Sequence, residues 1–236
     1  MIFTLDEEQN ALRDSVRRYC REHHAFAEQY RVRARSEGFC AEAWRRFAEF
    51  GWLGAALPEA VGGLGGSTIE TALIMEEFGR SLVVSPFFSC AVLAAQTLVA
   101  SQAGMSGRLL APVIGGTSLL ALAHFERRSR GHLEFLETRA HPASDGYLLN
   151  GEKCAVLHAD RADRFIVSAR TRGSPRDVDG VKLFLINGDA RGLARRDYRT
   201  IDRHGAADLI LRDVTAREED VLCSVNAIAA TKLAAA

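Results

Sequence analysis

Hydrophobic positions in the first half of the chain recur at the spacing of amphipathic helices. One stripe near the N-terminus comprises Leu5, Leu12, Val16, Tyr19 and Cys20. Thr4 and Glu7, three residues apart, predict a capping box that begins this helix. A second, shorter helix is expected around Trp44 and Phe47, ending before Gly51.

A run rich in glycine, 62–66, precedes the next predicted helix. Ser67 and Glu70 repeat the capping-box spacing, and Gly79 is expected to close the helix. The run follows a helix rather than a strand and lacks the lysine of a phosphate-binding loop. We therefore interpret it as a turn and not as a phosphate cradle. Two more helical stretches, 87–100 and 107–114, follow it.

From residue 118 onward, short β-rich runs separated by turn residues replace the helical stripes. The expected strands are Ser118–Ala123, Leu133–Thr138, Tyr147–Leu149, Lys153–Leu157, Arg164–Ala169, Val181–Ile186 and Asp208–Leu211. Asn150-Gly151 lies between two of these runs, and this dipeptide predicts a tight hairpin turn. Helical spacing returns at Ser224 and continues to Leu233.

These patterns predict an α+β multidomain protein. An all-α N-terminal helical domain, 1–117, would be followed by a β-rich middle domain, 118–222. The stretch 223–236 would begin a third, helical domain, whose bundle we expect to be missing.

Charge and composition narrow the range of functions that the chain can have. Thirty Lys and Arg residues balance thirty Asp and Glu residues, so no net field favours nucleic acid or an anionic membrane. The apolar stretch 86–100 is too short to cross a bilayer, and the acidic N-terminus lacks the pattern of a signal peptide. Five scattered cysteines without a CxxC pair are typical of a reducing compartment. We expect a cytoplasmic protein that acts on a small molecule.

Cysteine and histidine spacing indicates neither a metal site nor a hydrolase. Cys20, His23 and His24 share a helix at ligand-like spacing, but no second half of a metal site follows. We expect a polar helix end there. The other histidines stand apart, without the Ser, Cys or Asp arrangement of a catalytic triad.

Several segments, in this order, resemble the acyl-CoA dehydrogenase family. Those similar to its N-terminal domain are 50–54 (FGWLG), 57–65 (LPEAVGGLG) and 76–80 (EEFGR). Those similar to its middle domain are 148–153 (LLNGEK), 162–167 (ADRFIV) and 180–186 (GVKLFLI). The resemblance implies that residues 118–222 fold as a β-barrel-like middle domain. Within the family, 168–171 and 195–200 look most like the small subunit of pimeloyl-CoA dehydrogenase.

The resemblance implies an FAD-dependent oxidation that places a double bond between the α and β carbons of an acyl-CoA substrate. Electrons would pass to an electron-transfer flavoprotein or a similar acceptor. The α-proton of a thioester is weakly acidic, so the reaction needs a positioned carboxylate base. In the family this glutamate comes from the C-terminal helical domain, and no residue here matches it. We therefore assign no catalytic residue and expect the chain to be inactive alone. The chain could also form a homo-oligomer, or a hetero-oligomer with a full-length homologue.

The resemblance also places a cofactor loop at 125–130. The family has Thr-Glu-Pro at its start, whereas this chain keeps Glu126 but has Phe125 and Arg127. Phe125, Glu126 and Ser129 are thus candidate FAD contacts, and Arg130 is a candidate partner of the CoA phosphates. A solvated charged loop is the alternative.

Farther along, the family places a tryptophan and then a threonine or serine against the flavin. Here these positions are Ala155 and Leu157, which supply neither an aromatic contact nor a donor. Flavin affinity should be weaker unless a neighbouring aromatic residue compensates, and ordinary strand residues are the alternative. Phe87 and Phe88 resemble the acyl-pocket wall, with core packing as the alternative.

Two other hypotheses remain open at this point. The substitutions Phe125, Ala155 and Leu157 suit a non-catalytic partner subunit that binds acyl-CoA or stabilises a full-length dehydrogenase. A broken gene whose product has no role is the other.

Overall fold

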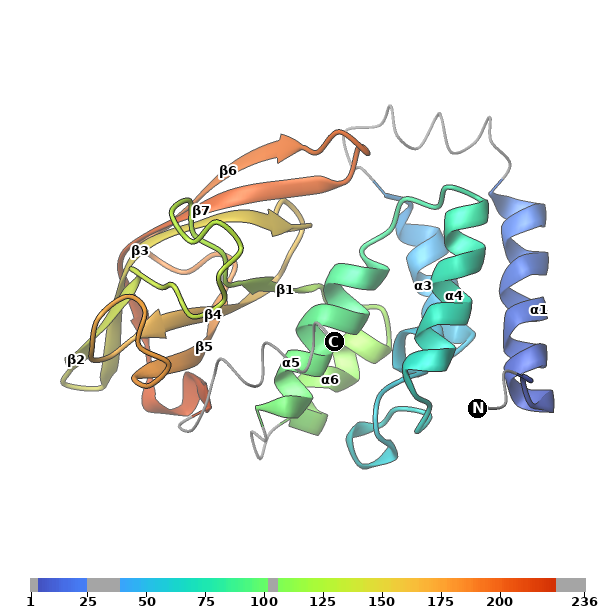
Figure 1. Ribbon diagram of the computed structural model, residues 1–236, viewed down its shortest axis with the longest axis horizontal. Coiled ribbons are helices and arrows are strands. Elements are labelled where there is room, and N and C mark those ends of the chain that lie inside the picture. The colour runs from blue at the N-terminus through green and yellow to red at the C-terminus, as the bar shows by residue number, and fades with distance from the viewer. Residues whose placement is uncertain (1–3, 25–38, 102–105, 224–236) are drawn as a thin grey trace.

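The computed structural model describes residues 4–24, 39–101 and 106–223, in which a helical half precedes a β-rich half (Figure 1). The helical elements are α1 (Glu7–His23), α3 (Ala41–Glu49), η1 (Trp52–Gly54), η2 (Glu59–Val61), α4 (Thr68–Arg80), the π-helix η3 (Phe87–Ala94), α5 (Ala95–Ala100) and α6 (Ser106–Ile114). The predicted order of helices followed by strands is confirmed.

The strands form one eight-stranded mixed sheet. They are β1 (Leu120–Ala123), β2 (Arg139–Ala143), β3 (Gly146–Leu157), β4 (Arg164–Arg170), β5 (Val181–Asn187), β6 (Leu193–Arg199), β7 (Gly205–Ala216) and β8 (Val221–Cys223). Their order is β6-β7-β3-β2-β4-β5-β8, and β1 pairs in parallel with β4. A short 3-10 turn, η4 (Glu218–Asp220), precedes β8.

The starts of α1 and α4 follow from side chains that satisfy free backbone N–H groups. The predicted cap at Ser67 and Glu70 is confirmed, although α4 continues through Gly79 to Arg80. The prediction for α1 was wrong, because Asp6 and not Thr4 caps the helix, and Gln9 completes the box. Aspartate is as strong an N-cap acceptor as serine, so it competes with threonine two residues earlier.

The glycine-rich run is a turn, as predicted. Gly62 and Gly65 have φ values of 90° and 74°, in the left-handed region that side chains rarely adopt. Gly63 lies so close to the Leu57 carbonyl that a Cβ atom would not fit. The run therefore positions Ser67 as the cap of α4.

The helical half and the sheet share one hydrophobic core. Phe78 contacts both Phe47 and Phe87, with ring centroids 4.9 and 5.4 Å apart. The same buried cluster continues through Leu120 of β1 to Ile166 of β4. The sheet has a second cluster on its other side, built around Phe165 and Phe184. The shared cluster fixes η3 against β1, where the candidate site lies.

The predicted hairpin at Asn150-Gly151 was wrong. These residues lie inside the continuous strand β3, and the chain reverses between Ala143 and Gly146 instead. Gly151 has a φ of 152° and sits at a register shift between β3 and β7. The side chain of Asn150 exchanges hydrogen bonds with Asp213 on β7 at 2.9 and 3.0 Å. The dipeptide thus forms an irregularity within a strand, because the positive φ of a glycine also suits a bulge.

The predicted strand Leu133–Thr138 was also wrong, since β2 begins only at Arg139. The buried guanidinium of Arg170 donates to the carbonyls of Glu134 and Leu136, at 3.2 and 3.3 Å. A side chain therefore binds the backbone carbonyls of this segment, which runs as a loop. The alternation of apolar and polar residues in 133–138 predicted a strand, but it does not indicate that a distant arginine binds the backbone carbonyls.

Strands β2, β6 and β8 were not predicted. Five of the seven β6 residues are exposed, so the strand lacks the alternation of a half-buried strand. The predicted helical stretch at 224–236 lies outside the described residues.

Candidate functional site

A small cavity of about 80 Å³ lies where η3, β1 and β3 meet. Its lining residues are Ser89, Leu93, Leu122, His124, Phe125, Leu133, Ala155 and Leu157. Three of the five residues predicted to meet the cofactor, Phe125, Ala155 and Leu157, are thus brought together. We take this cavity as the candidate site.

A bulge in β3 positions Ala155 at the cavity. Between Lys153 and Val156 the strand has one residue more than its partner β7, and Ala155 has a φ of 52°. The Ala155 N–H donates to Asp208 Oδ1 at 3.2 Å. The neighbouring Cys154 N–H donates to the Phe125 carbonyl at 2.8 Å, which joins the 125–130 loop to β3.

Glu126 faces the protein interior rather than the cavity. Its carboxylate is buried and accepts hydrogen bonds from Lys153 Nζ at 2.8 Å and from the Thr138 N–H at 3.0 Å. Lys153 is fully buried and also donates to the His124 carbonyl at 3.2 Å and to Ser168 Oγ at 3.1 Å. The ion pair therefore holds the start of the loop against β3 and β4.

Opposing effects set the pKa values of this pair. Burial raises the pKa of Glu126, but Lys153 and the backbone donors outweigh it, and the pKa stays below the ordinary value. Burial lowers the pKa of Lys153 to about 8, although Glu126 opposes the change. Both groups are therefore predominantly charged at neutral pH.

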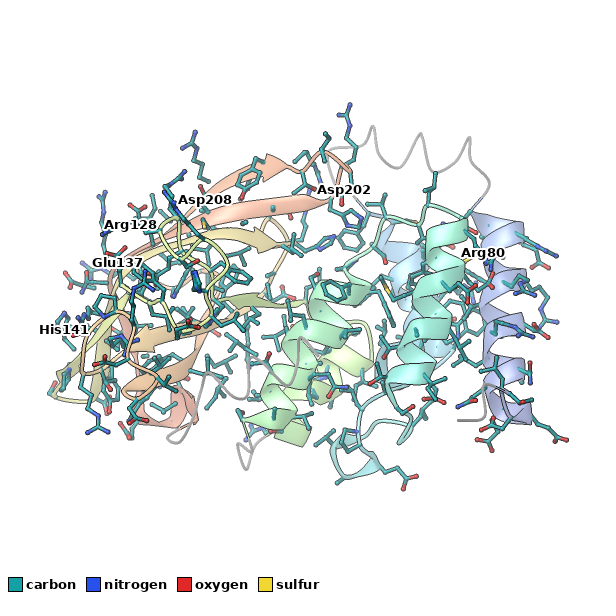
Figure 2. The ribbon with its side chains drawn as sticks, viewed as in Figure 1. Arg80, Arg128, Glu137, His141, Asp202 and Asp208 are labelled. Carbon is teal, nitrogen blue, oxygen red and sulfur yellow. The ribbon has the colours of Figure 1, made fainter. Side chains whose placement is uncertain are left out.

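The other predicted site residues lie away from the cavity lining. Ser129 is buried, and its hydroxyl donates to the Glu126 carbonyl at 2.8 Å, which stabilises the turn. Arg130 is exposed. Phe87 is buried in the helical core, whereas Phe88 is 44% exposed. In the same loop, Arg128 pairs with Glu137 at 2.6 Å; both are labelled in Figure 2.

His124 lines the cavity but was not identified from the sequence. Its ring is buried, and Nε2 lies 2.8 Å from the Leu133 carbonyl, so Nε2 carries the hydrogen and donates. Nδ1 has no hydrogen-bond partner in the part of the chain that the structure describes. Burial, with Lys153 adding to it, lowers the pKa of His124 to about 4. The histidine is therefore neutral at pH 7.

Ser89, which was also missed, connects the cavity to two histidines. Its hydroxyl lies 2.8 Å from His158 Nδ1, and His158 Nε2 lies 3.3 Å from His204 Nδ1. Burial, followed by His204 and Arg199, lowers the pKa of His158 to about 3. Such a weak base is poorly matched to activating a serine at neutral pH. We interpret the contact as a hydrogen bond that joins η3 to the turn that follows β3.

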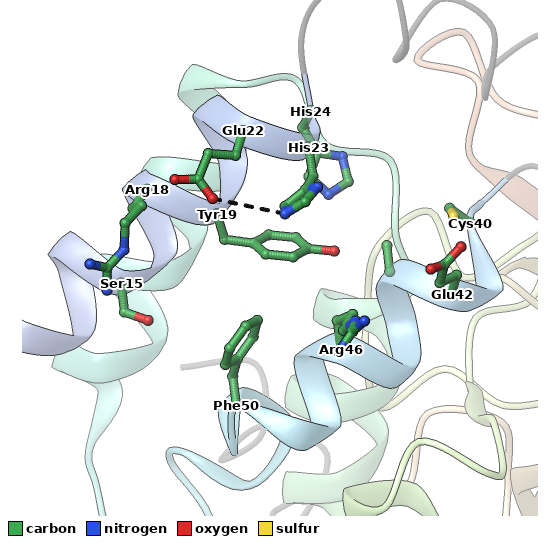
Figure 3. Close-up of a pocket in the computed structure, with 11 residues that line it drawn as sticks. Ser15, Arg18, Tyr19, Glu22, His23, His24, Cys40, Glu42, Arg46 and Phe50 are labelled. Atoms are coloured by element: carbon green, nitrogen blue, oxygen red, sulfur yellow. Dashed lines mark ion pairs between the residues drawn. The ribbon is translucent and has the colours of Figure 1, made fainter.

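A larger cavity, of about 500 Å³, lies between α1 and α3 (Figure 3). Its lining includes His23, His24, Cys40 and Glu42. Within residues 4–24, 39–101 and 106–223, no group of three potential metal ligands is close enough to hold an ion. This cavity contains none of the predicted cofactor residues, so it is not the candidate site.

The lining of the candidate site suits the face of an aromatic ring better than its polar edge. Six of its eight residues are apolar, and Phe125 is 41% exposed beside the exposed Ala155. These residues fit the packing of one face of a flavin. The side-chain donors that the family resemblance leads us to expect at 125 and 157 are replaced by Phe125 and Leu157. Polar contacts to a flavin would have to come from backbone groups or from other side chains.

No helix among the described residues is long and apolar enough to cross a bilayer.

Comparison with known proteins agrees with the order of the two halves. Residues 6–114 match the acyl-CoA dehydrogenase N-terminal domain, and residues 121–214 match its middle domain. Subunit CarC of the caffeyl-CoA reductase–Etf complex of Acetobacterium woodii is 29% identical over 194 residues, 80% of this chain and 51% of that protein. Benzylmalonyl-CoA dehydrogenase of Aromatoleum aromaticum is 29% identical over 200 residues, 82% of this chain and 50% of that protein. The chain thus spans about half the length of these relatives.

Solved structures show the same fold. A steroid ACAD variant is 30% identical with a TM-score of 0.85, and the match covers 98% of this chain and 61% of that one. PigA, solved as an FAD complex, is 21% identical with a TM-score of 0.85 over 98% of this chain and 62% of its own, which shows the fold alone. With both domain matches in the family's order, the chain belongs to the acyl-CoA dehydrogenase family.

Proposed function

We propose that this chain provides the helical and β-rich parts of an FAD-dependent acyl-CoA dehydrogenase, which desaturates an acyl-CoA thioester between its α and β carbons. One observation carries the proposal: within the matched domains, Phe125, Ala155 and Leu157 line one cavity between η3, β1 and β3. The names of both curated relatives refer to CoA compounds, and one belongs to a complex with Etf. An electron-transfer flavoprotein or a similar acceptor is therefore the proposed electron partner.

The residues of the site have different roles in this proposal. FAD, when bound, supplies the hydride acceptor. Phe125, Ala155 and Leu157 exclude water and pack against the ring face, while Glu126 and Ser129 act indirectly by holding the loop. Arg130, exposed on that loop, is available to the CoA phosphates.

The base that removes the α-proton has no counterpart at the cavity. Among the described residues, those lining it include no aspartate and no glutamate. Two carboxylates lie next to lining residues, and both are engaged. Glu126 is paired with Lys153 and faces away, and Asp208 accepts the Ala155 N–H and pairs with Arg127. We therefore propose that this polypeptide does not complete the reaction alone and that the base comes from outside the described residues or from another subunit.

Titration with FAD and assay with acyl-CoA test this proposal. The purified 236-residue chain is titrated with FAD and followed by flavin absorbance, and dye reduction is then assayed with acyl-CoA thioesters. We expect flavin binding without turnover. Dye reduction by the purified chain would contradict the proposed inactivity, and a folded chain that does not perturb the flavin spectrum would contradict the proposed cofactor.

A non-catalytic partner subunit is the second candidate. It is favoured because Phe125, Ala155 and Leu157 provide no side-chain donor to a flavin. Co-expression with a full-length homologue separates the candidates. A partner subunit co-purifies at a fixed stoichiometry in a homologue-containing oligomer, whereas recovery of the chain alone argues against this role.

A further inference from the structure

An exposed aromatic ring lies beside the bulge that positions Ala155. Tyr198 of β6 is 38% exposed, and its hydroxyl donates to Asp208 Oδ1 at 3.1 Å. The same carboxylate oxygen accepts the Ala155 N–H at 3.2 Å, and the other oxygen pairs with Arg127 at 3.4 Å. Asp208, labelled in Figure 2, thus connects the tyrosine directly to the bulge.

Strand register places Tyr198 on the same face of the sheet as Leu157. Tyr198 pairs with Ala206 across β6 and β7, and Leu157 pairs with the same alanine across β3 and β7. Residues that pair directly across strands point to the same face of a sheet. Tyr198 and the cavity-lining Leu157 therefore flank Ala206 on one surface.

We propose that Tyr198 supplies an aromatic face for the flavin ring, beside the space that Ala155 leaves. This inference deepens the proposed function and depends on it. The hydroxyl is already committed to Asp208, so Tyr198 contributes the face of its ring and not a hydrogen bond to the ligand. Because that bond holds the side chain in place, little conformational entropy remains to be lost when a planar ligand packs against it.

The surroundings of Tyr198 support a planar ligand with phosphates. Phe125, the other exposed ring near Ala155, belongs to the cavity lining. Arg127, which pairs with Asp208, begins a loop that also carries Arg128 and Arg130. Aromatic faces together with guanidinium groups match a heteroaromatic ring joined to phosphate.

Flavin titration of tyrosine variants tests the inference. The full chain, Tyr198→Leu and Tyr198→Phe are titrated with FAD and with FMN, and both the dissociation constant and the fluorescence of the bound flavin are measured. We expect Tyr198→Leu to weaken FAD and FMN by the same factor, about threefold to tenfold. Bound-flavin fluorescence should rise in both variants, because a stacked tyrosine quenches flavin by electron transfer and phenylalanine does not.

A matched control is Tyr147→Phe on β3. Tyr147 packs near Phe184, and its hydroxyl accepts a hydrogen bond from Lys182 at 2.8 Å. Loss of this hydroxyl should change neither the dissociation constant nor the fluorescence of the bound flavin. If circular dichroism shows that Tyr198→Leu is unfolded, the bound-flavin fluorescence of Tyr198→Phe tests the proposal by itself.

The outcomes separate this inference from the proposed function. If the wild-type chain binds no flavin, both fail. If it binds flavin and the Tyr198 variants change neither affinity nor fluorescence, only the tyrosine assignment fails. Weakened binding of FAD with unchanged binding of FMN would show that Tyr198 contacts the adenine half of FAD, which also overturns the assignment.

Discussion

Lys153 is a fully buried cation whose described partners are Glu126, Ser168 and the His124 carbonyl. Removing one partner of a buried ion pair leaves the other charge in a low-dielectric interior. We expect Lys153→Met to lower the free energy of unfolding by about 3–5 kcal/mol in urea denaturation.

Two variants control for this result. Lys182→Met on β5 removes a lysine that is only partly buried and should cost far less. Adding Glu126→Gln to Lys153→Met should recover part of the loss, because no uncompensated charge remains. A cost below about 1 kcal/mol for Lys153→Met would show that the pair is not a structural anchor.

His124 makes stability depend on pH. Burial holds its pKa near 4 in the folded protein, below the ordinary value of about 6.5, so the unfolded chain binds more protons between these values. Its contribution to stability is fully present above pH 6.5 and is lost as the pH falls toward 4. We expect His124→Gln, which keeps a donor for the Leu133 carbonyl, to reduce the slope of unfolding free energy against pH by about 1.4 kcal/mol per unit in that window. An unchanged slope would contradict a neutral, buried His124.

At the scale of the element, α4 depends on its N-terminal cap. The Ser67 hydroxyl accepts the Ile69 N–H at 3.1 Å, and Glu70 reaches back to Ser67 at 2.7 Å. We expect Ser67→Ala to destabilise the protein by about 1 kcal/mol in chemical denaturation. Thr68→Ala, one residue farther along, serves as the control and should cost less, since Thr68 is not the capping residue.

Elements set by local patterns could be predicted, whereas those set by distant partners could not. The apolar stripes of α3 and α4, and the cap of α4, each involve residues a few positions apart, so the sequence alone indicated both helices. Strand β6 exists because β7 pairs with it, although its own residues are mostly exposed. Asn150-Gly151 satisfied the local rule for a hairpin, but Asp213, far along the chain, uses Asn150 within a bulged strand pair.

At the scale of the whole molecule, the two halves share one core. Leu120 and Ile166 of the sheet belong to the same buried cluster as Trp44 and Trp52 of the helical half. We expect a single cooperative unfolding transition, with tryptophan fluorescence and far-ultraviolet circular dichroism giving the same midpoint. Both tryptophans lie in the helical half, so separate midpoints would show that the sheet unfolds independently.

The family resemblance identified part of the lining of the candidate site, and residue spacing alone identified none of it. Phe125, Ala155 and Leu157 were identified because they occupy family positions, and the structure brings them to one cavity. The lining residues His124 and Ser89, and Tyr198 of the proposed flavin contact, were missed. Their proximity depends on the pairing of β7 with both β3 and β6 and on the packing of η3 against β1. Such contacts between distant segments leave no trace in local spacing.

The single additional residue in β3 also constrains how this strand can vary. Side chains alternate along a strand with a period of two, and the additional residue lets both Lys153 and Val156 be buried, three positions apart. Deleting one residue at 154–155 would remove the bulge. The side chains on one side of the deletion would then point to the opposite face of the sheet from the one they face now. Homologous chains should therefore tolerate amino-acid exchanges at Ala155 and Leu157 far better than a change in the length of this segment.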